Sequence, residues 1–235
     1  MTRHRPLCAP LGFTDGQVEA LKWIGLGSMF CDHIGRHLLG MPLESWAFIA
    51  GRLAFPLFAL VLAVNLAREG DRAERCARTT VRLAAWGAVA LLPSIWARGD
   101  PMMLNVLFTL SLGAAVCWAM ESPAPVALRA VACVAIAAAS WLVEFGTAGV
   151  FLVAAGYLWC TQRGGGLALL VLLLLAATGW LNALFGGWAS FFSTMAALPV
   201  AWAARHLPLK VPRIQHLFYV IYPLHLAVIG ALKAV

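Results

Sequence analysis

Long apolar runs, separated by short polar or glycine- and proline-rich breaks, make up most of the chain. A run of about 20 apolar residues can cross the ~30 Å hydrocarbon core of a membrane as an α-helix. Only the letters FGGW separate the seventh run from the eighth, so eight helices is the alternative to nine. The pattern predicts about nine membrane-spanning helices, over residues 20–39, 46–66, 80–97, 103–120, 126–142, 146–161, 166–183, 187–204 and 214–233.

Composition agrees with this pattern. Hydrophobic residues make up 62% of the chain and charged residues 11%, with a mean hydropathy of +0.84. Soluble domains carry about 25% charged residues. We therefore expect an all-α, polytopic integral membrane helix bundle, with a single transmembrane domain over residues 1–235. The net charge of +7 falls in short loops that set membrane orientation, so it does not indicate a nucleic-acid partner.

The positions of Lys and Arg predict a cytoplasmic N-terminus, because cations gather in the cytoplasmic loops of membrane proteins. With the N-terminus inside, Arg36, Arg98 and Lys233 lie outside, and Arg52 lies in the membrane. The remaining cations all lie inside: Arg3, Arg5, Lys22, Arg68, Arg72, Arg75, Arg78, Arg82, Arg129, Arg163, Arg205, Lys210 and Arg213. The arginines between the second and third spans would face anionic lipid or attract an anionic cosubstrate.

Asp32 and His33 lie inside the first apolar run. A carboxylate at bilayer depth costs roughly 2.5–3.5 kcal/mol, so it needs a partner or a task. Arg36 and His37 follow one helical turn later, beside Asp32 and His33. One interpretation is an Asp32–Arg36 pair neutralised at the membrane surface. The interpretation we favour is a catalytic carboxylate beside a histidine that acts as a base or acyl carrier.

Polar residues of the second and fourth predicted spans enter the membrane from the outer side, where Asp32 and His33 also lie. Pro56 cannot donate to the carbonyl of Arg52, so we expect a kink there. Arg52 either reaches the outer headgroups, neutralises Asp32, or binds an anionic group of a substrate. Asn105 and Thr109 share one helix face, and either bond a neighbouring helix or line the same cavity as Asp32.

The last span contributes Tyr219, Tyr222 and His225 at three-residue steps, which places them across one broad helix face. Tyrosines often lie at membrane interfaces, but Tyr222 and His225 fall deeper in the span. We therefore expect Tyr222 and His225 to belong to the site. Pro223 frees the carbonyl of Tyr219 as Pro56 does for Arg52.

Other polar groups carry less information. Arg98, Asp100 and Glu144 fall in short outer loops, where we expect them to be solvated. The six cysteines are widely spaced, without a CxxC or other metal-ligand spacing, so we expect no metal site and no disulfide framework.

Four segments together resemble the TraX family: LKWIGLGSMFCDHIG (21–35), GRLAFPLFALVLA (51–63), NVLFTLSLG (105–113) and HLFYVIYPLHLAVIG (216–230). They occur in the family's order, and within the family the chain looks most like the TrbP conjugal transfer proteins. The resemblance implies a multi-pass enzyme of the bacterial inner membrane. Its reaction would transfer an acetyl group from acetyl-coenzyme A to the N-terminal amine of processed conjugative pilin.

The resemblance also implies the site residues Asp32, His33, Arg52, Asn105, Tyr222 and His225. We expect His33 to be the base or a transient acetyl carrier, with Asp32 fixing its charge state and His225 as the second candidate base. Arg52, Asn105 and Tyr222 would supply hydrogen-bond donors, and we also expect Tyr219 and Thr109 to contact substrate or coenzyme A. The partners would be pilin, coenzyme A and membrane lipids, with coenzyme A entering from the arginine-rich side.

Other functions fit the same residues. A non-enzymatic pilin chaperone, including one that assists pilin cyclisation, needs only polar helix faces that hold a partner. An enzyme could act on pilin termini in another way, or acylate another substrate. Asp and His also serve as relays in transporters of protons or small anions. Binding of coenzyme A would separate an acyltransferase from a chaperone or a proton relay.

Overall fold

The computed structural model describes residues 12–212, 214 and 216–234, and these residues form helices and connecting loops without a β-strand. Segment 1–11, which includes Arg3 and Arg5, lies outside the described residues, and so does Arg213. The elements are α1 (Asp15–His33), η1 (Ile34–Leu38), α2 (Trp46–Gly51), α3 (Ala54–Leu66), α4 (Arg72–Val89), α5 (Leu91–Arg98), α6 (Val106–Glu121), α7 (Val126–Ala139), η2 (Ser140–Leu142), α8 (Gly146–Gln162), α9 (Gly165–Met195), α10 (Ala197–His206) and α11 (Leu217–Lys233).

The first predicted span is α1 followed by a π-helical turn. Thr14 caps α1: its hydroxyl accepts from the Gln17 amide at 3.4 Å, and the Gln17 side chain accepts from the Thr14 amide at 2.9 Å. This reciprocal capping box satisfies two donors that a helix start leaves unpaired. The π-helical turn Ile34–Leu38 begins directly after Asp32 and His33. Such turns are rare overall, and many of those known lie at functional sites.

The second and third predicted spans are both interrupted near a proline. The helix of the second span stops at Gly51 and resumes at Ala54, because Pro56 has no amide hydrogen for the carbonyl of Arg52. In the third span, α4 and α5 meet at a bend of 46°, and Pro93 likewise cannot donate to the turn before it.

The charged stretch expected to separate the second span from the third is partly helical, which corrects the predicted start of the third span. Asp71 caps α4 by accepting from the Glu74 amide at 2.9 Å, so the helix begins at Arg72 rather than near residue 80. A strong N-cap with an acidic residue in the first turn stabilises a helix start even in a polar sequence.

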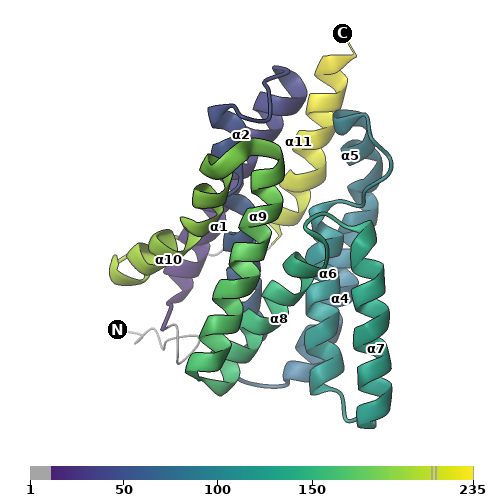
Figure 1. Cartoon of the computed structure of the whole chain (residues 1–235), viewed down its shortest axis with the longest axis vertical. Helices are drawn as coiled ribbons and strands as arrows, with labels where there is room; N and C mark the ends of the chain where they lie inside the picture. Colours follow the sequence, from purple (N-terminus) through teal and green to yellow (C-terminus); the bar gives the residue numbers. More distant parts are fainter. Residues whose placement is uncertain (1–11, 213, 215, 235) are drawn as a thin grey trace.

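The predicted seventh span is the first arm of a hairpin in α9, and the predicted eighth span is the second arm together with most of α10. Gly186 (φ −124°) and Gly187 (φ +65°) leave the helical conformation. The Asn182 amide donates to the Thr194 hydroxyl at 2.9 Å, although 12 residues separate them. A straight helix would place such residues about 18 Å apart. The chain therefore reverses at the two glycines and returns along itself toward α10 (Figure 1).

The number of membrane spans predicted from the sequence is not confirmed. Among the described residues, Trp46–Leu66 and Gly165–His206 are long and apolar enough to cross a membrane, although the second of these segments contains the reversal at Gly186 and Gly187. Helices α4 and α5 would be a third span if counted together. The apolar helices Val106–Glu121 and Leu217–Lys233 are shorter. At 1.5 Å per residue, the 16 residues of α6 reach about 24 Å, less than the hydrocarbon thickness.

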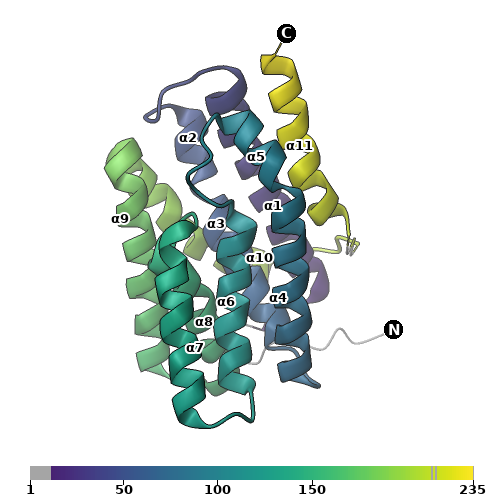
Figure 2. The same ribbon diagram turned by 90° about the vertical axis from the view of Figure 1, so that its right-hand side faces the viewer.

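The helices pack side by side along the long axis of the molecule. Helix α6 packs against α4, α7 and α8, while α1 and α3 contact each other in the centre (Figures 1 and 2). Helix α11 lies along α5, and α9 covers α8 and α2. This arrangement brings the polar residues of α1, α2, α9 and α11 toward one end of the bundle.

Candidate functional site

A cavity of about 1240 Å³ runs between the helices. Its lining residues recur along α1 from Lys22 to His33, a rise of about 16 Å at 1.5 Å per residue, and continue to Arg36 and His37 in η1. One end is basic, the middle is apolar and the other end is polar. The basic end is lined by Lys22, Arg68, Arg75 and Arg82; the middle by Leu26, Met29, Phe55, Phe58, Leu107 and Leu110; the polar end by Asp32, His33, Arg36, His37, Arg52, Arg98, Glu144 and Asn182.

Asp32 and Arg52 form a buried ion pair at the polar end. The Arg52 guanidinium donates to one Asp32 carboxylate oxygen, and their side chains are 10% and 8% exposed. Arg36 lies 3.9 Å from the other Asp32 oxygen, Oδ1, which is buried and accepts no hydrogen bond. Gly51 permits the close approach, because a Cβ there would lie 2.3 Å from the Asp32 Cβ. Of the three roles predicted for Arg52, this geometry supports the counter-ion.

The Arg52 side chain is held on three further sides. Its Nε donates to the Phe48 carbonyl at 3.1 Å, and its guanidinium lies 3.9 Å from the centre of the Phe48 ring. Its Nη1 donates to the Asn182 side chain at 3.4 Å. The tip of the α9 hairpin holds Phe48 in place, because Gly186 packs directly against that ring. Arg52 is therefore fixed by α1, its own helix and α9.

Asn182 is a site residue that the sequence reasoning missed. Its amide nitrogen bonds Thr194 across the hairpin while its oxygen accepts from Arg52. Its signal in the sequence is a single amide inside the apolar run LLLLAATGWLNALF. A buried amide in such a run needs partners, and this one has them on two helices.

His33 and His225 are hydrogen-bonded to each other. His33 Nδ1 lies 2.7 Å from His225 Nε2, and the two rings are nearly parallel. His225 Nδ1 lies 2.9 Å from the Ile221 carbonyl, which can only accept. Two neutral rings must therefore carry their hydrogens on Nδ1, so His225 Nε2 accepts from His33. This leaves His33 Nε2 as an unprotonated nitrogen, and His33 lines the cavity.

The two tyrosines of the last helix lie in different parts of the cavity. Tyr222 is buried beside the histidines, with ring centres 6.4 Å from His33 and 5.6 Å from His225. Tyr219 lies toward the basic end, where the Arg82 guanidinium is 5.2 Å from its ring centre and Trp86 stacks on it. The helix face predicted for Tyr219, Tyr222 and His225 therefore extends from the basic end of the cavity to the polar end.

Asn105 and Thr109 do not line the cavity in the described part of the chain. The Asn105 side chain caps α6 by accepting from the Leu107 amide at 3.1 Å and donates to the Gly87 carbonyl at 2.9 Å. The Thr109 hydroxyl donates to the Glu144 carbonyl at 2.5 Å. Both are fully buried, and their contacts fit the alternative of ties between helices.

Glu144 and Arg98 were expected to be solvated, and this expectation is wrong. Arg98 donates to Glu144 at 2.6 Å, their side chains are 17% and 27% exposed, and both line the cavity. Glu144 lies in the loop between η2 and α8, which pairs with Leu104 through two backbone hydrogen bonds. Burial raises the pKa of the Glu144 carboxyl, and the positive charge of Arg98 opposes that rise.

The described residues contain no group of three or more His, Cys, Asp or Glu side chains that could hold a metal ion. The polar end of the cavity instead offers the His33 imidazole, two paired carboxylates and three guanidinium groups. These groups can exchange a proton and stabilise an anion.

Fold and site together define a helical protein with membrane-capable segments and a buried charged centre. The model of the family "TraX protein" matches residues 17–233. A Protein TraX from Escherichia coli is 31% identical over 229 residues, which covers 94% of this chain and 89% of that protein. A second, from strain K12, is 34% identical over 106 residues, covering 45% and 41%. The chain belongs to the TraX family. No solved structure matches it.

Proposed function

We propose that this protein is a membrane acyltransferase that transfers an acetyl group from acetyl-coenzyme A to the N-terminal amine of processed pilin. The observation that supports this most directly is the His33–His225 pair, which in its neutral form leaves Nε2 of His33 without a hydrogen, at the polar end of a cavity whose other end is basic. A thioester donor with an anionic nucleotide and an apolar arm matches the order of basic, apolar and polar lining.

The basic end would hold the phosphates of coenzyme A. Arginine binds phosphate through two parallel hydrogen bonds, so Arg82 beside Tyr219 suits a nucleotide. Lys22 and Arg75 also line this end; Lys22 pairs with Glu19, and Arg75 bonds backbone carbonyls. The apolar middle would then enclose the pantetheine arm and deliver the thioester to His33.

At the polar end, His33 would act as the base. Its Nε2 accepts a proton from the acceptor amine while the amine nitrogen forms a bond to the thioester carbonyl carbon. The developing oxyanion would be stabilised by the guanidinium of Arg36 or by the Tyr222 hydroxyl. When the carbon–sulfur bond breaks, the thiolate takes the proton from His33. The products are an acetylated amine and free coenzyme A.

His225 would be a positioning residue rather than the base. Its Nδ1 is engaged with Ile221, its Nε2 with His33, and it is not among the residues that line the cavity. It fixes which nitrogen of His33 carries the hydrogen, as a second residue does for the base of other acyl-transfer enzymes. Asp32, paired with Arg52, would balance the charge around the imidazolium that forms.

The test uses purified protein in vesicles, acetyl-coenzyme A and a pilin peptide with a free N-terminus, with the product measured by mass spectrometry. We expect His33→Ala to lower kcat by about 10²–10⁴-fold, the usual contribution of a general base. His225→Ala should lower kcat with little change in KM. His206→Ala is the matched control, because His206 is exposed on α10 and contacts Trp202. Full activity of His33→Ala would end the proposal.

A transporter of protons or small anions is the second candidate, favoured by one observation: the cavity extends from the basic end to the polar end. Titration with coenzyme A distinguishes the two functions. An acyltransferase should bind it and lose affinity in Arg82→Ala, whereas a transporter should show no binding and should move protons in sealed vesicles.

A further inference from the structure

The wall of the cavity is open on one side, between the start of α8 and the tip of the α9 hairpin. Trp141, Thr147 and Phe185 line the cavity there and are also exposed, Trp141 at 82% and Phe185 at 62%. Exposed apolar surface favours contact with other apolar groups, so the rim of this opening suits an apolar occupant. Helix α9 belongs to a segment long and apolar enough to cross a membrane, so an apolar occupant of the bilayer is the kind that this side opening suits.

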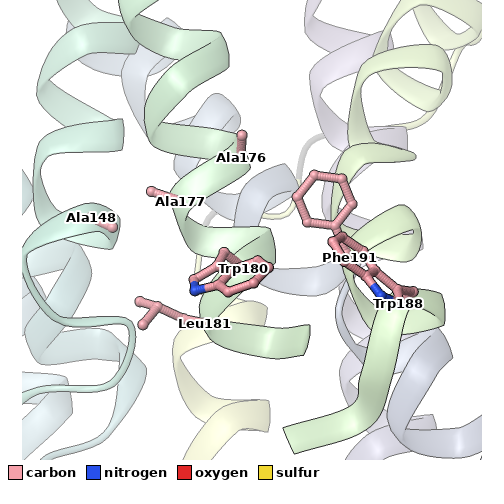
Figure 3. A pocket seen from close by; sticks show the side chains of 7 residues that line it. All are labelled: Ala148, Ala176, Ala177, Trp180, Leu181, Trp188 and Phe191. Carbon is pink, nitrogen blue, oxygen red and sulfur yellow. The ribbon is translucent and has the colours of Figure 1, made fainter. Parts of the chain in front are cut away.

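A second hollow, of about 530 Å³, adjoins the main cavity at the side opening, because two residues line both. Figure 3 shows its walls: Ala148 on α8, Ala176, Ala177, Trp180 and Leu181 on the first arm of the hairpin, and Trp188 and Phe191 on the second arm. Ala148 and Leu181 line both this hollow and the main cavity. All seven residues are apolar, so the hollow suits a hydrophobic occupant.

The polar end of the cavity lies immediately behind the side opening. Leu181 is followed in the chain by Asn182, which accepts from Arg52, and Arg52 pairs with Asp32. His33 is the next residue along α1. Leu181, Asn182, Arg52, Asp32 and His33 all line the main cavity, so a chain that enters past Leu181 reaches the space that contains the ion pair and His33.

The chemistry at the inner end selects the end group of the occupant. Asp32 Oδ1 is buried and lacks a hydrogen bond, so it can accept one from an arriving donor. A primary amine is such a donor, whereas a phosphodiester brings only acceptors. Hydrophobic walls outside and a carboxylate oxygen inside that accepts no hydrogen bond thus fit an apolar chain that ends in an amine.

We propose that the side opening admits the N-terminal end of a membrane-embedded apolar polypeptide, whose terminal amine reaches Asp32 Oδ1 and His33. This inference rests on the proposed acyl transfer and adds the route of the acceptor. The donor enters from the basic end and the acceptor enters from the bilayer, so the two substrates need not pass each other.

The test compares two acceptors with variants of the side opening. One acceptor is an apolar peptide of membrane-spanning length with a free N-terminus; the other is a short soluble peptide with the same terminus. Ala148→Trp and Leu181→Trp fill the opening. Leu173→Trp is the matched control, because Leu173 is 59% exposed on the same helix, about two turns earlier, and lines neither hollow.

We expect both filling variants to lower kcat/KM for the apolar peptide by about tenfold or more, and to change it less than about twofold for the soluble peptide. Leu173→Trp should match the parent protein with both acceptors. Equal loss for both peptides, or no loss for either, would overturn the proposed route. Acetylation of aminophospholipid in place of the apolar peptide would overturn it too.

A second readout does not need catalysis. An apolar peptide with a photoreactive group near its N-terminus should cross-link to residues 176–191 in the parent protein and much less in Leu181→Trp. If the parent protein acetylates neither peptide, the proposed function fails, while the cross-link still reports on the side opening. Cross-links confined to other helices would refute it.

Discussion

Breaking the Asp32–Arg52 pair should destabilise the protein more when the carboxylate is removed than when the cation is removed. Both side chains are about nine-tenths buried. Removing one partner of a buried pair costs about 3–5 kcal/mol, because a charge is left without compensation. In a chain of this size each kcal/mol shifts Tm by about 2–4 °C, so a single variant should lose about 6–20 °C.

The asymmetry follows from what each variant leaves behind. Asp32→Asn leaves Arg52 buried with Arg36 nearby, and a guanidinium cannot lose its proton. Arg52→Met leaves Asp32 with Arg36 at 3.9 Å, and a carboxyl group can take up a proton instead. We therefore expect Asp32→Asn to lie near the upper end of that range and Arg52→Met near the lower end. The double variant should melt above Asp32→Asn, since it buries neither charge.

The assay is thermal unfolding in detergent followed by the fluorescence of the ten tryptophans. The matched control is the exposed pair of Glu74 and Arg78, whose atoms lie 3.6 Å apart with side chains 58% and 70% exposed. Such surface pairs are worth about 0–1 kcal/mol, so Arg78→Met should shift Tm little. If Asp32→Asn shifts Tm no more than Arg78→Met, or if the double variant is the least stable of all, the reasoning is refuted.

Two further substitutions test the supporting structure. Asn105→Ala removes a helix cap and the hydrogen bond to the Gly87 carbonyl, so it should lower the free energy of unfolding by about 1–3 kcal/mol. The folded variant should keep its KM for acetyl-coenzyme A, and a change in KM without a loss of stability would contradict this interpretation. Gly186→Ala places a Cβ 2.5 Å from the Phe48 ring and should lose about 1–3 kcal/mol together with activity, whereas Gly27→Ala, which meets nothing within 4 Å, should lose neither.

The apolar runs located the helices well. Most predicted spans coincide within a few residues with one helix or a pair of consecutive helices, because a helix in a membrane must be both apolar and internally hydrogen-bonded. The predicted break near Arg52 was also correct, since it depends on a proline four residues away in the sequence. The start of α4 at Arg72 was missed because hydropathy does not register an N-cap.

The sequence predicted only part of the candidate site. Asp32, His33 and Arg52 could be predicted as site residues because charged or titratable groups inside apolar runs require partners. The structure brings these three residues together with His225. Asn105 stood out by the same rule, yet it caps a helix. Polarity inside a span therefore identifies a residue that must be satisfied, but not what satisfies it.

By itself, the sequence determined that the chain is helical and membrane-capable, where its helices lie, and which few polar side chains are buried among them. Tertiary structure alone decided which of those side chains meet. The pairing of His33 with His225, the contact of Asn182 with Arg52 and the side opening beside Leu181 join residues far apart in the chain. These contacts depend on how the helices pack and on the reversal at Gly186 and Gly187. Local patterns of polarity in the sequence predict neither.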